Sequence, residues 1–93
     1  MTPEVAKHIL TESFSAKVEG NTYHVDAERN CVLLLEHNNG IMQINGVISI
    51  DFGDALMSVS TDEDTYFLMP ESIFGLKGRS PDQISQRPGF RRP

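Results

Sequence analysis

The sequence has few cysteines, no long apolar segment and few basic residues outside its C-terminal end. Cys31 is the single cysteine of the 93-residue chain, so an intramolecular disulfide is excluded. A membrane-spanning helix needs about 20 apolar residues, and no stretch of this sequence approaches that length. The first residues also lack the basic start and apolar block of a secretory signal. We therefore expect a cytoplasmic protein with no membrane partner.

Charge is divided unevenly along the chain. Residues 1–76 contain three basic and twelve acidic residues, a net charge of 3 − 12 = −9, whereas residues 77–93 contain five basic residues and one acid, 5 − 1 = +4. Binding to DNA or RNA needs a basic surface, so the body argues against nucleic acid as a partner. An acidic body instead favours a protein partner with a basic surface, because opposite charges accelerate association.

The same charge boundary predicts two regions, an acidic domain over 1–76 and a flexible basic tail over 77–93. Three prolines, two glycines and few apolar residues make the tail unable to fold alone. We expect it to complement an acidic surface of its own body or of another copy. A terminus without a partner is the alternative. The partner-binding residues predicted in the tail are Arg87, Phe90, Arg91 and Arg92.

The N-terminal segment predicts a short helix. Thr2 suits the cap position, Pro3 the first turn, and Glu4 the positive end of the helix dipole. An apolar stripe at a spacing of four residues follows and needs a surface to pack on. After Glu12 the period changes to two, and strands are predicted in "SFSAKVE" from Phe14 and in "TYHVDA". "CVLLLEH" is apolar on both faces, which is typical of a central strand.

Turn residues separate the predicted strands. Gly20-Asn21 marks one turn, and the Asn39-Gly40 and Asn45-Gly46 pairs both suit type I′ hairpin turns. If both Asn-Gly pairs are tight turns, "IMQI" is a four-residue strand. If only the first is, Gly46 is a bulge within one long strand, an arrangement we favour slightly because bulges help small barrels to close. Further strands are expected up to residue 69, with an acidic hairpin turn at "TDED".

Together these patterns predict a mainly β fold with a minor α component. We expect a small antiparallel meander that forms a barrel or a two-layer sandwich, with a short N-terminal helix. Pro70 begins a predicted C-terminal helical turn over residues 70–76, "PESIFGL", whose apolar side chains would cover an open end of the sheet.

A possible polar site lies in "HVDAE". On a continuous strand His24 and Asp26 would share a face, and Glu28 would join them if the strand ran on. Imidazole and carboxylate groups can hold a transition metal, but Thr22 lies on the same face and no further ligand spacing accompanies them. We therefore favour a solvated strand face and expect no metal, no cofactor and no catalytic residue.

The function expected from these features is a non-enzymatic protein-protein interaction module, an adaptor, inhibitor or regulator. Its tail would mediate docking or self-association, and a homo-oligomer is expected as one form because free strand edges favour pairing. A small-molecule-binding β-barrel is the alternative, with walls drawn from Met42, Met57, Met69, Tyr23 and Tyr66. A small enzyme using His24, Asp26 or His37 is the least favoured reading.

Overall fold

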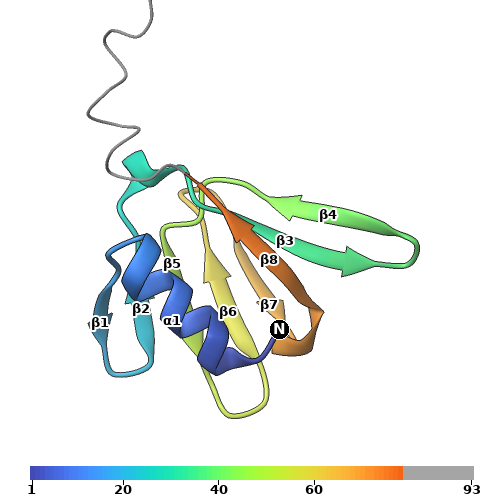
Figure 1. Cartoon of the computed structure of the whole chain (residues 1–93), viewed down its shortest axis with the longest axis horizontal. Helices are drawn as coiled ribbons and strands as arrows, with labels where there is room; N and C mark the ends of the chain where they lie inside the picture. The colour runs from blue at the N-terminus through green and yellow to red at the C-terminus, as the bar shows by residue number, and fades with distance from the viewer. Residues whose placement is uncertain (79–93) are drawn as a thin grey trace, which may run out of the picture.

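The computed structural model describes residues 1–78, which form two antiparallel sheets and one α-helix (Figure 1). The larger sheet has the strand order β1-β2-β5-β6-β7, and the smaller has the order β4-β3-β8. The helix α1 spans Pro3–Ser13, and the strands are β1 Lys17–Glu19, β2 Thr22–His24, β3 Val32–His37, β4 Gly40–Ile44, β5 Ser49–Phe52, β6 Met57–Ser60, β7 Thr65–Leu68 and β8 Ile73–Lys77. The short 3-10 helices η1 (Ala27–Arg29) and η2 (Pro70–Ser72) connect strands.

The helix α1 begins as predicted but ends later. The Thr2 hydroxyl accepts a hydrogen bond from the Val5 N–H at 3.3 Å, with Pro3 in the first turn. Phe14 is the C-cap rather than the first residue of a strand, and its ring is buried. The prediction of a strand from Phe14 is therefore wrong. Ser15 has a positive φ of 53° that redirects the chain, so β1 begins only at Lys17.

The five-stranded sheet buries one face through strict alternation. In its central strands, Ile50 and Phe52 of β5 pair with Val59 and Met57 of β6, and all four side chains are buried. Tyr23 of β2 extends this face by packing edge-to-face on Phe52, with ring centroids 5.4 Å apart. Period-two alternation, the basis of the strand predictions, is thus set by burial on one side.

The three-stranded sheet has β3 at its centre, which confirms the prediction made from "CVLLLEH". Its hairpin to β4 exists, but the Asn39-Gly40 assignment is wrong. His37 pairs with Gly40, so the loop consists of Asn38 and Asn39, and the positive φ, 53°, belongs to Asn38. In Figure 1 this hairpin projects away from the rest of the molecule.

The Asn45-Gly46 pair marks a crossing between sheets, so the favoured prediction of a bulge within one long strand is wrong. The other alternative is right that "IMQI" forms a short separate strand, within β4, but wrong that a hairpin turn follows it. β4 ends at Ile44 in the smaller sheet, and β5 starts at Ser49 in the larger one. Gly46 has a φ of 69°, which an L-residue adopts at a cost. The buried Val47 then anchors the crossing, because its N–H donates to the Cys31 carbonyl at 3.0 Å.

The predicted C-terminal helical turn forms only in its first half. Pro70 starts η2, but the helix stops at Ser72, and the chain continues as β8. Ile73, Phe74 and Leu76 therefore lie on a strand that pairs with β3. The second edge of β3 offers a ladder of hydrogen bonds, interrupted by one register shift between Leu34 and Leu35, which a single helical turn cannot match.

The two sheets and α1 form a sandwich-like, two-layer arrangement and not a closed barrel. Of the two predicted architectures, the two-layer sandwich is therefore confirmed. In Figure 1, α1 lies in front of the five-stranded sheet, and β8 passes in front of the sheet beside it. The core between these layers is apolar. The N-terminus is held to β8, because the Met1 amino group donates a hydrogen bond to the Ile73 carbonyl at 3.0 Å. The fully buried side chains at its centre are Leu10, Leu33, Ile50, Met57, Ile73, Val47, Val59 and Cys31.

The structure reaches two residues into the predicted tail. Lys77 ends β8, and Gly78 passes so close to the Phe14 ring that a Cβ there would collide with it. The predicted tail residues Arg87, Phe90, Arg91 and Arg92 lie outside the described residues. Within residues 1–78 no helix has the length and apolar character needed to cross a membrane.

Candidate functional site

The outer face of the five-stranded sheet, which points away from α1 and the core, is almost entirely polar. Strand register places its side chains in two rows that cross all five strands. One row consists of Lys17, His24, Ser49, Ser60 and Thr65, and the other of Glu19, Thr22, Asp51, Ser58 and Phe67. Phe67 is the exception in these rows and is 69% exposed.

Phe67 belongs to a group of apolar side chains at one corner of this face. Met69, two residues further along an extended backbone, points to the same side and is 54% exposed. Met57 pairs with Leu68, so Leu56, which directly precedes Met57, lies next to Met69, which directly follows Leu68. Leu56 is 50% exposed. We call Leu56, Phe67 and Met69 the apolar patch.

Acidic side chains border the apolar patch. Asp51 lies in the same row as Phe67, with Ser58 between them. Asp54 lies in the β5–β6 turn, which is closed by a hydrogen bond from the Gly53 N–H to the Leu56 carbonyl at 3.0 Å. An exposed apolar group with a polar rim is typical of a surface that binds another protein.

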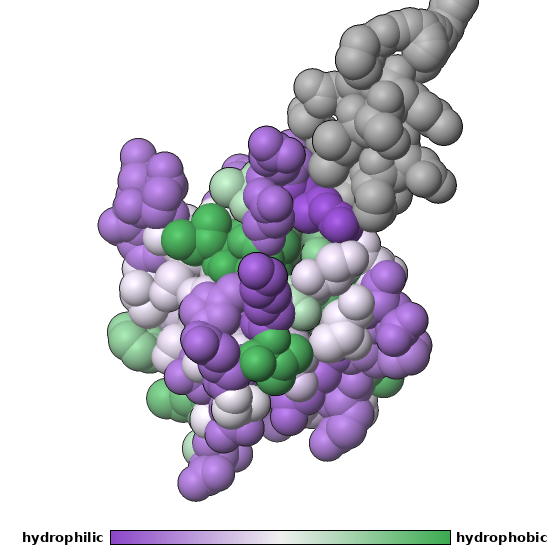
Figure 2. All heavy atoms as spheres, turned by 90° about the vertical axis from the view of Figure 1, so that its left-hand side faces the viewer, coloured by the Kyte–Doolittle hydropathy of each residue, from purple (hydrophilic) through white to green (hydrophobic). Residues whose placement is uncertain are grey.

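The two edge strands of the larger sheet differ in their protection. The edge strand β1 is only three residues long and carries Lys17 and Glu19, the charged and short form that discourages pairing with another chain. Seen from this side of the molecule, hydrophilic side chains dominate the surface (Figure 2). The edge strand β7, by contrast, has no charged residue from Thr65 to Leu68. The asymmetry indicates that the β7 side, not the β1 side, is the candidate interaction surface.

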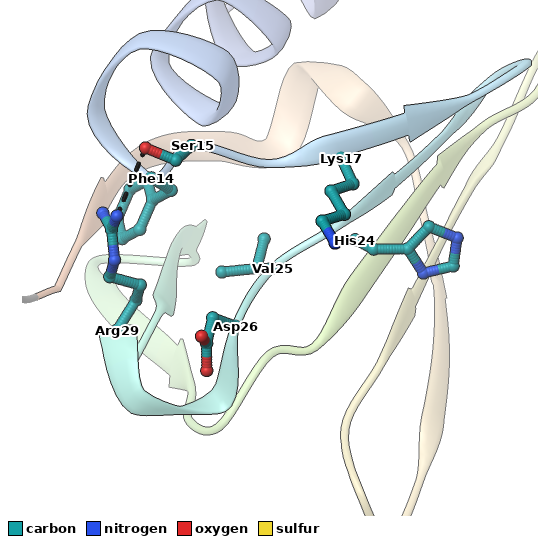
Figure 3. Close-up of a pocket in the computed structure, with 7 residues that line it drawn as sticks. All are labelled: Phe14, Ser15, Lys17, His24, Val25, Asp26 and Arg29. Atoms are coloured by element: carbon teal, nitrogen blue, oxygen red, sulfur yellow. Dashed lines mark hydrogen bonds between the residues drawn. The ribbon is translucent and has the colours of Figure 1, made fainter.

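A separate cleft of about 340 Å³ lies at the opposite side of the sheet, where α1 ends beside η1. Figure 3 shows Phe14 and Arg29 on one side of it, Lys17 and His24 on the other, and Val25 between them. The Arg29 guanidinium donates to the Ser13 carbonyl at 3.1 Å and to the Ser15 hydroxyl at 3.2 Å. Arg29 thereby ties the end of the helix to η1.

The structure separates the three residues of the predicted polar site. β2 ends at His24, so a continuous strand face through Asp26 and Glu28 does not form. His24 Nε2 lies 3.0 Å from Glu19 Oε1 across the hairpin. Asp26 caps η1, because its carboxylate accepts a hydrogen bond from the Glu28 N–H at 3.0 Å. His24 and Asp26 both line the cleft, but Glu28 does not.

The described residues 1–78 contain no group of three or more histidine, cysteine, aspartate or glutamate side chains placed to hold a metal ion. Cys31 is buried, and this burial raises the pKa of its thiol from 9.0 to about 12. The thiol is therefore protonated at neutral pH and is a poor nucleophile.

The apolar patch was missed by sequence reasoning, although a usable signal existed. Sequence patterns place Met69 in the wall of the alternative ligand pocket and give Phe67 and Leu56 no role in binding. Alternation along "TYFLM" places Phe67 and Met69 on the face opposite Tyr66 and Leu68. What the alternation did not reveal was which of these two faces meets the core.

A second exposed aromatic residue, Phe74, lies on the outer face of the smaller sheet. It is 55% exposed and lies with Ile41 at a shallow cleft of about 280 Å³ near the β3–β4 loop.

Comparisons of the chain with protein-family models, with curated proteins and with solved structures found no match.

Proposed function

We propose that this protein is a non-enzymatic protein-protein interaction module whose acidic body and basic C-terminal segment mediate docking or self-association. The observation that carries the proposal is the apolar patch of Leu56, Phe67 and Met69 on an otherwise polar sheet face. Three large apolar side chains exposed at one corner lose their contact with water when a partner covers them. Because they are 50–69% exposed, each would gain about half to two thirds of the roughly 1.5–3 kcal/mol that full burial of such a side chain contributes.

The charge distribution supports a partner, or a partner segment, that is basic. Within residues 1–78 there are four basic and twelve acidic residues, a net charge of 4 − 12 = −8. Acids also border the apolar patch at Asp51 and Asp54. Apolar contact would supply most of the binding energy, whereas the charges would supply fast association and selection against acidic partners.

The proposal is tested by measuring association of the full chain directly. Sedimentation velocity over a wide range of protein concentration should show a complex, either of identical copies or, after addition of a cell extract fractionated by size, with a stoichiometric partner identified by mass spectrometry. Substitution of Phe67 by serine should weaken that complex. A chain that stays monomeric and recovers no stoichiometric partner would contradict the proposal.

The cleft beside α1 supports a second candidate, a small-molecule site. Its volume of about 340 Å³ lies at the lower end of the range for ligand pockets. Lys17 and Arg29, two of the basic residues in an acidic body, both line it against one acid, Asp26, whose carboxylate caps η1, so a small anion is the expected class of ligand. Thermal-shift measurements with inorganic phosphate and with citrate should then show stabilisation that Lys17→Gln removes. An equal response of both proteins would contradict a site in the cleft.

A further inference from the structure

The apolar patch and the C-terminal sequence have complementary chemistry. The patch presents three apolar side chains, with Asp51 two strands from Phe67 in the same row and Asp54 in the turn two residues before Leu56. The C-terminal segment of residues 87–93, "RPGFRRP", presents one aromatic residue, Phe90, with arginines on both sides of it. An aromatic anchor flanked by arginines is the composition that concentrates binding energy at interfaces.

From this match we propose that residues 87–93 of one copy dock on the apolar patch of a second copy. Phe90 contacts Phe67 and Met69, and Arg91 and Arg92 approach the carboxylates of Asp51 and Asp54. The inference rests on the proposed function and specifies its self-association form. Pro88 has no N–H to donate to a strand ladder, and the proposed contacts are made by side chains.

The place where the chain leaves the described domain favours a second copy over the chain's own patch. Gly78 lies in the layer of α1, close to η1, since a Cβ there would be 2.8 Å from the Arg29 carbonyl oxygen. η1 follows β2, and β2 is three strand positions away from β7 in the sheet order. The patch also lies on the opposite face of that sheet.

The path from Gly78 to the apolar patch is long. Three strand spacings of ~4.8 Å, a sheet thickness of ~10 Å and the depth of the side chains add up to a path of roughly 30–35 Å around the end of the sheet. Eleven residues lie between Gly78 and Phe90, and the twelve residue steps from one to the other span at most about 40–43 Å even when fully extended. Contact within one chain would require strong extension, whereas a second copy can approach the segment freely.

Two such contacts related by a two-fold axis would close a dimer, because each copy has one segment and one patch. Each arginine–carboxylate pair at an exposed site contributes only ~0.2–1 kcal/mol, so most of the affinity comes from the aromatic contact. The dimer should therefore weaken with added salt but persist at about 1 M salt, where the Debye length is ~3 Å.

The experiment is sedimentation velocity on the full chain and on single variants. Phe67→Ser and Phe90→Ala should each raise the dimer dissociation constant by at least about 30-fold, the effect of losing a 2 kcal/mol contact. Phe74→Ser is the matched control, because Phe74 is also an exposed strand phenylalanine but lies on the smaller sheet. It should leave the dissociation constant unchanged. Circular dichroism melting of each variant checks that all remain folded.

Mixing the two defective variants tests whether the contact forms between copies. Phe67→Ser keeps an intact segment, and Phe90→Ala keeps an intact patch, so a mixed dimer regains one of the two contacts. The mixture should associate more strongly than either variant alone. If both variants are monomeric and the mixture is too, contact within one chain explains the data, and the inference is overturned.

The remaining outcomes separate this inference from the proposed function. A wild-type dimer that is insensitive to Phe67→Ser and Phe90→Ala would overturn the docking of residues 87–93 but leave an interaction module that uses another surface. A dimer disrupted equally by Phe74→Ser would move the interface to the smaller sheet. A wild-type chain that is monomeric at every concentration overturns the inference, and the proposed function then depends on a different protein partner.

Discussion

At the scale of single residues, the contribution of a side chain depends on which face of its element meets the core. In α1, Leu10 is fully buried, whereas Val5, an apolar residue of the same helix, is 47% exposed. We predict that Leu10→Ala lowers the free energy of unfolding by about 2–5 kcal/mol, since it leaves a cavity in a close-packed interior. Val5→Ala should change it by less than about 0.5 kcal/mol. Urea denaturation of both variants measures the difference, and similar losses would show that α1 is not packed by this face.

Cys31 gives a prediction about pH. Burial raises the pKa of its thiol from 9.0 to about 12 in the folded protein. The folded state thus holds the proton more tightly than the unfolded state, so this contribution to stability is fully present below pH 9 and is lost as pH rises toward 12. The free energy of unfolding should fall more steeply over that range in the wild type than in Cys31→Ala. Parallel pH curves from denaturant titrations would contradict the assignment.

The same burial should control reactivity. At pH 8 the native thiol is expected to react with a disulfide reagent far more slowly than the thiol of protein unfolded in urea, because it is both inaccessible and protonated. Equal rates in the two conditions would show that Cys31 is exposed.

At the scale of elements, the caps decide where short helices start. The Asp26 carboxylate accepts from the Glu28 N–H at 3.0 Å and so begins η1. We predict that Asp26→Ala lowers the free energy of unfolding by roughly 0.5–2 kcal/mol, whereas Asp26→Asn, which keeps an acceptor, loses only a few tenths. Thermal and urea unfolding provide the measurement. If both variants lose the same amount, the negative charge of Asp26 matters more than its cap, which would point back to a role in the cleft.

Two Asn-Gly pairs show how far local sequence determines an element. Asn39-Gly40 was predicted as a type I′ turn and Asn45-Gly46 as either such a turn or, slightly favoured, a bulge. The first pair overlaps the loop of a hairpin, and the second lies at a crossing between sheets. Gly46 has the positive φ that the sequence indicated, but no strand returns to pair with β4 after it. The backbone preference was correctly predicted, and the element was not, because the buried Val47 draws the chain toward the core.

At the scale of the whole molecule, the mainly β class followed from period-two alternation and from turn residues such as Gly20. The division of the strands between two sheets could not be predicted. β3 and β4 leave the larger sheet, and β8 returns to β3 across more than thirty residues of intervening chain. Such long-range pairing depends on which apolar faces share one interior, a property that no local pattern contains. The apolar patch was missed for the same reason.

The charge balance of the whole molecule leads to a final prediction. Among residues 1–78, leaving aside the side chain of His37, no lysine or arginine lies within ion-pairing distance of a carboxylate, and the exposed His24 contacts Glu19 at 3.0 Å, against a net charge of −8 from four basic and twelve acidic residues. Repulsion between carboxylates should therefore outweigh attraction, and NaCl at about 0.5 M should raise the free energy of unfolding by some tenths of a kcal/mol up to ~1 kcal/mol. The measurement is best made by urea denaturation of Phe67→Ser, so that association does not contribute. Neutralising the β6–β7 turn with Asp62→Asn, Glu63→Gln and Asp64→Asn should reduce the salt effect, because that turn concentrates three acids. If salt instead destabilises the protein, favourable charge interactions outweigh the repulsion, and the carboxylates repel one another less than the net charge implies.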